Sequence, residues 1–341
     1  MAQQADFFAL MNLDEGEAVH KPRRRARTAA VRPAPAPVAP PVPEIAYDAQ
    51  YEAWACELER TGRYRILRRL EFPPVVPRPL KAGEKLAIII DTETTGLDPT
   101  KEEVIELGMV AFAYGEDGAV GDVIATYSQL REPSVPISAE ITKLTGITPE
   151  MVKGHALDLD EVARFIAPAA LVIAHNARFD RPFCERLLPD FAHKAWACSA
   201  SQVDWSGFGF EGVKLGYLVG QSGWFHNGHR AVDDCQALLA VLGAPLKEAE
   251  GIAFSRLLST ARLPTFRVWA EGAPFDMKDH LKKRGYRWND GSDGRPKSWW
   301  IEVTEAGLAD ELAYLKAEIY LREVDLMVQK ITAFERFRPG V

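Results

Sequence analysis

The feature that most constrains this sequence is an apolar run that ends abruptly in two acids. Residues 86–90 (LAIII) are all aliphatic, and Asp91 and Glu93 follow at once with one threonine between them. An unbroken run of this kind predicts a strand buried on both faces. Because side chains alternate along a strand, Asp91 and Glu93 project from the same face. Such a pair either binds a hard divalent cation or consists of solvated acids at a strand end, and the motif alone leaves both interpretations open.

Composition narrows the class of protein. With 341 residues, 47% hydrophobic and 26% charged, the chain can bury one large core and a second small one. No apolar run approaches the roughly 18 residues of a membrane span, and the N-terminus lacks a signal-peptide pattern, so we expect no membrane association. The net charge of -7 argues against general coating of nucleic acid, although local basic patches can still bind phosphate. The cysteines lie far apart without a C-x-x-C pair, which indicates neither a zinc site nor disulfides and suits a cytoplasmic location. They are Cys56, Cys184, Cys198 and Cys235.

Residues 1–44 have the composition of a disordered tail. A basic run at residues 21–27 precedes a proline-rich segment at residues 33–43, which is extended or disordered. Two adjacent phenylalanines have no role in the fold of such a tail. The segment resembles the short peptides with which bacterial replication and repair proteins bind the sliding clamp, and a frayed turn or a chance match is the alternative. The residues that match are Gln4, Asp6, Phe7 and Phe8.

The middle of the chain alternates between strand and helix patterns. Residues 45–80 predict a helical arm and a proline-broken connector, and residues 81–248 predict the main α/β domain. Strand-like runs occur at residues 104–114, 123–130 and 171–174, with helical material around residues 138–144. The last of these strands also ends in polar residues, with Asp180 six positions after it. Two buried strands therefore terminate near acids.

A further acid lies in a predicted helix that begins near His229 and ends at Gly243. His229 and Asp234 are five positions apart, about 500° of helical rotation, so they cannot share one helix face. His229 must then lie on the preceding loop, while Asp234 points inward from the first turns. A histidine at a helix start is more often a cap or a surface residue than a catalytic one.

Together, three segments resemble the three motifs of the DEDDh 3′-to-5′ exonucleases, a family that includes the proofreading epsilon subunit of bacterial DNA polymerase III. They are residues 91–97 (DTETTGL), 175–180 (HNARFD) and 229–234 (HRAVDD), in the family's order and spacing. The likeness covers residues 84–243. It implies an RNase H-like mixed sheet flanked by helices, which binds two divalent cations, Mg²⁺ or Mn²⁺.

The resemblance also implies roles for individual residues. Asp91 would bridge both cations, Glu93 and Asp234 would complete the site on the side of the nucleophile, and Asp180 would support the second cation. His229 would be the general base, since a neutral imidazole can take a proton near pH 7.

The same likeness suggests a pocket for the 3′-terminal nucleotide. The backbone of the turn after Glu93 would hold the 3′-hydroxyl, and Leu97 would wedge beside the terminal base or simply pack. Phe179 lines the same groove or belongs to the core. The candidate substrate-binding residues are Thr94, Thr95, Gly96, Leu97, Asn176 and Phe179.

Residues 249–341 predict a small α+β module. It has helices at residues 252–261, 277–283 and 308–320, a strand at residues 265–270, and two strands joined by a glycine-rich turn at residues 289–294. Residues 256–300 contain ten Lys and Arg against five Asp and Glu, together with four of the eight tryptophans. Basic residues among aromatic ones suit a platform for single-stranded nucleic acid, but a small module also needs aromatic residues for its core.

Our prediction is a metal-dependent 3′-5′ exonuclease that removes nucleoside 5′-monophosphates from DNA 3′ ends in proofreading or repair, with a polymerase as a further candidate partner. One alternative is an exoribonuclease that trims RNA ends, because the same motifs serve ribonucleases. Another is a non-catalytic adaptor of the replication machinery with an exonuclease-like fold. The four acids and His229 favour the enzyme, because an adaptor has no need for mutually repelling carboxylates.

Overall fold

The computed structural model of the chain describes residues 49–246, 250–292 and 294–338. The predicted tail at residues 1–44, with its phenylalanine pair, lies outside the described residues. The described chain begins in α2 (Ala49–Arg60), where helical periodicity predicts a helix, and the residues of α2 are exposed or half-buried. Across the described ranges, no helix combines the length and the apolar character needed to cross a membrane.

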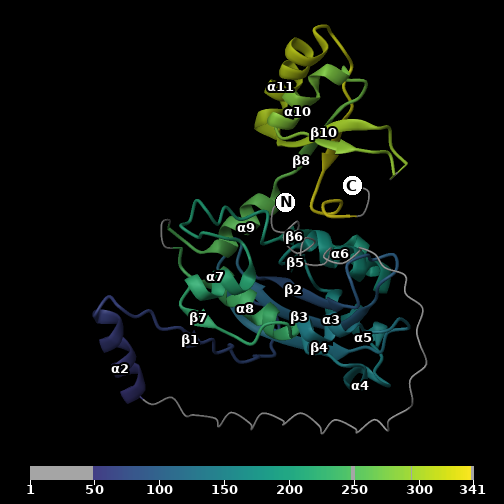
Figure 1. Cartoon of the computed structure of the whole chain (residues 1–341). Helices are drawn as coiled ribbons and strands as arrows, with labels where there is room; N and C mark the ends of the chain where they lie inside the picture. The colour runs from purple at the N-terminus through teal and green to yellow at the C-terminus, as the bar shows by residue number, and fades with distance from the viewer. Residues whose placement is uncertain (1–48, 247–249, 293, 339–341) are drawn as a thin grey trace, which may run out of the picture. The chain divides into compact units, whose positions relative to one another are not determined.

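The main domain is organised around a five-stranded mixed sheet with the order β4-β3-β2-β5-β6 (Figure 1). β2 pairs antiparallel with β3, and β3 antiparallel with β4, whereas β5 and β6 run parallel to β2. All eleven residues of β3 are buried, which explains its continuous apolar sequence. The predicted mixed α/β sheet is therefore confirmed. Its strands are β2 (Lys85–Thr94), β3 (Val104–Tyr114), β4 (Val120–Leu130), β5 (Leu171–Ala174) and β6 (Trp196–Cys198).

Helices cover both faces of this sheet. Ala87 and Ile89 face a core built with α7 (Leu215–Gln221), α8 (Ala231–Gly243) and α9 (Ala253–Arg262). Ile88 and Ile90 face the opposite core, built with α5 (Leu159–Ile166) and α6 (Ala177–Leu187). Side chains alternate along a strand, so the odd-numbered residues of β2 face α8 and the even-numbered residues face α6 up to the end of the strand.

Shorter elements complete the main domain. Ser138 and Thr148 cap two helices by accepting hydrogen bonds from backbone N–H groups of the first turn. A small parallel pair of strands, β1 and β7, lies outside the central sheet. These elements are β1 (Arg68–Arg69), α3 (Ala139–Thr145), α4 (Pro149–Val152), η1 (Pro189–His193) and β7 (Trp224–Phe225).

The C-terminal module contains a four-stranded antiparallel sheet with the order β11-β8-β10-β9. One face of it packs against α10, α11 and η3 through a core that includes Val268, Ala270, Leu281 and Leu315. The sequence pattern did not predict β11, which follows the last helix. The elements are β8 (Thr265–Ala270), η2 (Phe275–Met277), α10 (Lys278–Lys283), β9 (Arg287–Asn289), β10 (Ser298–Thr304), α11 (Glu305–Tyr314), η3 (Leu315–Tyr320) and β11 (Val328–Ile331).

After β11 the chain returns to the core of the main domain. The buried guanidinium of Arg181 donates to the backbone carbonyls of Phe334 and Arg336 at 2.7 and 2.6 Å, and Phe337 joins the core beside α5 and α6. α9, assigned to the module from the sequence, packs in the core beside α8. We propose that the main domain includes α9 and residues 332–338, in addition to the predicted range 81–248.

Candidate active site

Three carboxylates meet at the end of β2. Asp91 and Glu93 come from β2, and Asp234 comes from the first turn of α8. One oxygen of each lies within 4.8 Å of the others, and all three residues are half-buried. A half-buried group of oxygen ligands is the donor set that Mg²⁺ and Mn²⁺ prefer. These residues therefore fit the cation site expected from the sequence.

A glycine allows α8 to approach the sheet at this point. Gly108 of β3 lies directly opposite Asp91 in the strand register. A Cβ atom at Gly108 would lie only 2.3 Å from the carbonyl carbon of Ala231 at the start of α8. Because real Cβ atoms do not come that close to backbone, any side chain here would push the helix away. Gly108 thereby sets how near Asp234 comes to Asp91.

Asp180 reaches the same strand end from the opposite face of the sheet. It lies on α6 and is buried, and its Oδ1 accepts a hydrogen bond of 2.9 Å from the hydroxyl of Thr92. Thr92 stands between Asp91 and Glu93 and faces α6, so the strand presents acids to one helix and a hydroxyl to the other. Asp180 is not one of the three clustered acids, but among neighbouring charges it has the largest effect on Asp91.

The electrostatics of the site reflect burial of like charges. Burial raises the pKa of Asp91 well above its ordinary value, and the charges of Asp180 and Glu93 raise it further. Burial also raises the pKa of Glu93 from 4.5 to about 8 and that of Asp180 from 3.8 to about 7. Since ionising two or more adjacent carboxylates is electrostatically unfavourable, the group takes up either protons or cations.

Two histidines lie near Asp234, and the sequence analysis considered only one of them. His229 lies on the loop before α8, as predicted; its side chain is exposed, and its backbone N–H donates to Asp234 Oδ2 at 2.8 Å. The side chain of His226 is only 7% exposed, and its Nε2 lies 2.7 Å from Asp234 Oδ1. The sequence did contain a signal for His226, because it lies only three residues before His229, with an Asn-Gly pair between them.

An ion pair between a buried glutamate and a partly exposed arginine holds the start of α8 in place. Glu106 of β3 is fully buried opposite Glu93, and its carboxylate accepts from the guanidinium of Arg230 at 2.8 Å and from the backbone N–H of Ala231 at 3.2 Å. These bonds compensate a buried charge and cap the helix. Neither residue of this pair was expected from the sequence. The signal was an acid inside the otherwise apolar run of residues 104–114.

Four of the expected substrate-binding residues lie at the end of β2 or directly after it. A β-bulge separates Glu93 from Thr94, a feature common beside active sites. The hydroxyl of Thr94 donates to the carbonyl of Gly96, and that of Thr95 donates to Glu102, so both side chains shape the turn. Leu97 beyond it is 40% exposed.

Asn176 and Phe179 differ in their surroundings. Asn176 is exposed with a φ of 96°, a strained conformation that is frequent at functional sites. Phe179 is half-buried and packs 5.1 Å from the ring of Phe183, so it contributes to the core.

A family model described as Exonuclease matches residues 88–242, a range that contains the four acids and both histidines. This segment therefore matches the exonuclease family. The predicted resemblance to exonucleases and the predicted RNase H-like fold are therefore confirmed.

Curated relatives of the exonuclease domain are PolC-type DNA polymerases III. That of Caldanaerobacter subterraneus is 27% identical over 213 residues, which cover 56% of this chain and 15% of the polymerase. That of Clostridium perfringens is 32% identical over 169 residues, which cover 47% of this chain and 11% of the polymerase. The chain thus spans only a small part of the length of these relatives.

Solved structures show partial likenesses. Exonuclease X in complex with 5′ overhanging duplex DNA is 24% identical, with a TM-score of 0.35 over 50% of this chain and 99% of that chain. E. coli exonuclease I in complex with a dA16 oligonucleotide is 13% identical, with a TM-score of 0.44 over 67% of this chain and 68% of that chain. The family assignment rests on the sequence match.

Proposed function

We propose that the exonuclease domain removes nucleoside 5′-monophosphates from the 3′ ends of DNA in proofreading or repair. The main support is the meeting of Asp91, Glu93 and Asp234 within 4.8 Å, next to Asp180. These four acids would hold two divalent cations, Mg²⁺ or Mn²⁺. Bound cations would neutralise phosphate charge and make a coordinated water more acidic.

The chain's own residues would orient the acids and move the proton. Thr92 holds Asp180 by its hydroxyl, and Glu106 with Arg230 holds the start of α8. We propose His229 as the general base, because an exposed imidazole on a loop beside Gly228 can turn toward the attacking water. His226 would instead keep the carboxylate of Asp234 in place.

Histidine variants separate these two roles. His229→Ala should reduce the hydrolysis rate about 10²- to 10⁴-fold, the usual contribution of a general base. His226→Ala should act through a weaker apparent affinity for Mg²⁺. Initial rates over a Mg²⁺ titration distinguish the two effects, and a His229→Ala enzyme of normal rate at neutral pH would remove this residue from the role.

The terminal nucleotide would lie against the turn after Glu93. The backbone of Thr94, Thr95 and Gly96 would hold the 3′-hydroxyl, and the exposed Leu97 would contact the terminal base. Asn176 and Phe179, on the loop and helix that lead to Asp180, would border the same groove.

The decisive experiment compares 5′-labelled DNA and RNA oligomers of matched sequence with Mg²⁺, with Mn²⁺ and with a chelator. We expect a ladder of DNA products that shorten from the 3′ end with either metal and an intact substrate with the chelator. Faster shortening of RNA would favour the exoribonuclease. Binding without any product would favour the adaptor.

We further propose that the chain works with a polymerase and the sliding clamp in the cytoplasm. The names of the polymerase relatives and the clamp-like peptide at Gln4, Asp6, Phe7 and Phe8 support these partners, and the four thiols, none of which forms a disulfide within the described residues, suit the compartment. A double Phe7→Ala, Phe8→Ala variant should lose retention on immobilised clamp. Equal retention would show that the peptide is not a clamp ligand.

A further inference from the structure

One face of the C-terminal sheet bears arginines and tryptophans in place of a helix layer. Trp300 of β10 lies opposite both Trp269 of β8 and Arg287 of β9, and Arg267 lies opposite Glu302. Residues opposite each other across a sheet share a face. Because Val268 and Ala270 face the helices, this set faces away from them. We call Arg267, Trp269, Arg287 and Trp300 the Arg/Trp face.

The guanidinium groups of this face stack on its indole rings. The Arg267 guanidinium carbon lies 4.2 Å from the centroid of the Trp300 ring, and that of Arg287 lies 5.3 Å from the same centroid. Arg295 lies 5.5 Å from the centroid of Trp269. Alternating cations and rings of this kind combine phosphate neutralisation with surfaces for base stacking.

Arg267 has an unused donor although it is buried. Its side chain is 4% exposed, and within the described part of the chain its Nε has no hydrogen-bond partner. Its nearest acid, Glu302, lies 3.5 Å from another nitrogen of the guanidinium and also accepts a hydrogen bond from Thr265. Burial lowers the pKa of Arg267, and the charges of Arg295 and Arg178 contribute to this lowering. An unsatisfied buried donor among like charges is unfavourable until an anionic acceptor binds.

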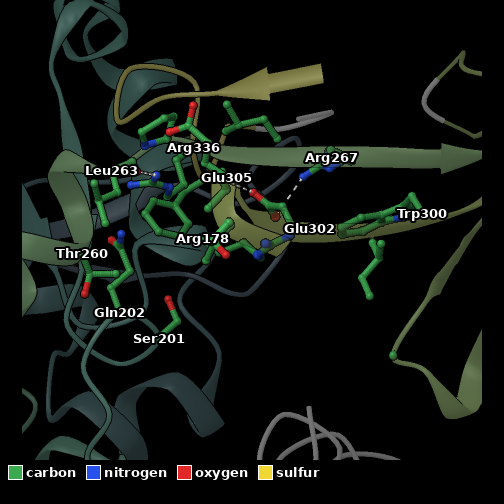
Figure 2. Close-up of a pocket in the computed structure, with 18 of the residues that line it drawn as sticks. Arg178, Ser201, Gln202, Thr260, Leu263, Arg267, Trp300, Glu302, Glu305 and Arg336 are labelled. Atoms are coloured by element: carbon green, nitrogen blue, oxygen red, sulfur yellow. Dashed lines mark hydrogen bonds and ion pairs between the residues drawn. The ribbon is translucent and has the colours of Figure 1, made fainter. Parts of the chain in front are cut away.

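The face opens into a cleft of about 990 Å³ that also includes part of the exonuclease domain. Figure 2 shows Arg267 and Trp300 along one wall, with Arg178 and Gln202 from the exonuclease domain. Arg178 lies on α6 two positions before Asp180, so the cleft and the acid site share a helix. The lining includes four arginines and two glutamates. The arginines are Arg178, Arg267, Arg287 and Arg336, and the glutamates are Glu302 and Glu305.

We propose that the Arg/Trp face and this cleft bind single-stranded nucleic acid, upstream of the 3′ end that enters the acid site. The arginines would contact phosphates, and Trp300 would stack on a base. An acidic peptide could use the same charges but has no use for an indole platform. The polarity of the strand rests on the proposed function, whereas binding itself does not require hydrolysis.

The test measures binding of the full chain in chelator, by anisotropy of labelled single strands of about 5 and about 30 nucleotides. Trp300→Ala should weaken binding of the long strand about ten-fold, the usual effect of losing one stacked base. Arg287→Gln should also weaken it and reduce its salt dependence by about one counterion. The short strand, too small to span both sites, should be affected less. Parallel DNA and RNA arms identify the preferred strand, and a loss in either arm supports the proposal.

The matched controls lie on the same module away from this face. Trp288 is the neighbour of Arg287 on β9 and projects oppositely, and Lys283 is exposed on α10. Trp288→Ala and Lys283→Gln should bind like the wild type. Wild-type affinity of Trp300→Ala and Arg287→Gln, with melting curves that show a folded chain, would overturn the proposal, as would equal losses in the controls. A chain without nuclease activity that still binds through Trp300 would refute the proposed function alone.

Discussion

The acid site and the Arg/Trp face both hold like charges close together, and different chemistry offsets the repulsion in each. Each concentrates charges of one sign in a partly buried place. Asp91, Glu93 and Asp180 can take up protons, which reduces the repulsion between their carboxylates, and their raised pKa values reflect this. Arginine cannot release its proton near neutral pH. Arg267 and Arg287 are instead stabilised by cation–π contacts with the Trp300 ring. The acid site is therefore suited to cations, and the Arg/Trp face is suited to phosphates.

The two regions also differ in how they are supported. The acids stand on a sheet with helices on both faces. Gly108 and Glu106 set the position of α8, and Thr92 holds the carboxylate of Asp180. The arginines stand on the face of the C-terminal sheet that is opposite to its helix-packed core. Changes at the acid site should therefore act through precise positions, and changes at the Arg/Trp face through charge and through the loss of a ring for stacking.

The largest expected effect separates catalysis from binding. Asp91→Asn should abolish metal-dependent hydrolysis, because it removes a charged ligand of the proposed cation site, yet it should keep the affinity for single strands in chelator. Gel analysis of products and anisotropy on the same preparation test both parts. Asp160→Asn, at an exposed position on α5, is the control with normal activity. A variant that still degrades DNA would refute the site assignment.

An intermediate effect should follow from one added methyl group. Gly108→Ala would displace α8 and move Asp234 from Asp91, which should reduce hydrolysis about ten-fold or more and destabilise the fold by about 1–3 kcal/mol. Initial rates and urea unfolding measure these changes. Gly216→Ala on α7 meets no atom within 4 Å and should be neutral or stabilising. Normal activity of Gly108→Ala would mean that the helix position is not limiting.

The smallest effect concerns pH. In the folded chain the pKa of Glu93 is about 8 and that of Asp180 is about 7, above their ordinary values of 4.5 and 3.8. The native state then binds more protons than the unfolded state across this window, so the stability of the metal-free chain should fall as pH rises from about 4 to about 8. Melting temperatures in chelator measure the slope, and Glu93→Gln should flatten it. A steeper slope in Arg287→Gln than in wild type would contradict the contrast, since arginine side chains in general do not titrate in this pH range.

Much of the fold follows from local pattern. The strands at residues 104–114, 171–174 and 265–270 have the predicted bounds, because segments rich in β-branched, aromatic and other apolar residues mark strands. β6 and β11 were not predicted. They are three and four residues long, too short for a periodic signal, and become strands by pairing with β5 and β8.

The sequence by itself identified Asp91 and Glu93 directly after the apolar run of β2, and Asp180 and Asp234 in the first turns of two helices. An apolar run and the polar residues beside it are neighbours along the chain, so local pattern is enough to find them. Only the tertiary structure decided that Asp180 arrives from the opposite face to Asp234, that His226 contacts Asp234, and that Gly108 admits α8. It also placed arginines and tryptophans from three strands on one surface. These arrangements depend on strand register and on the approach of helices to a sheet, which join residues that lie far apart in the sequence.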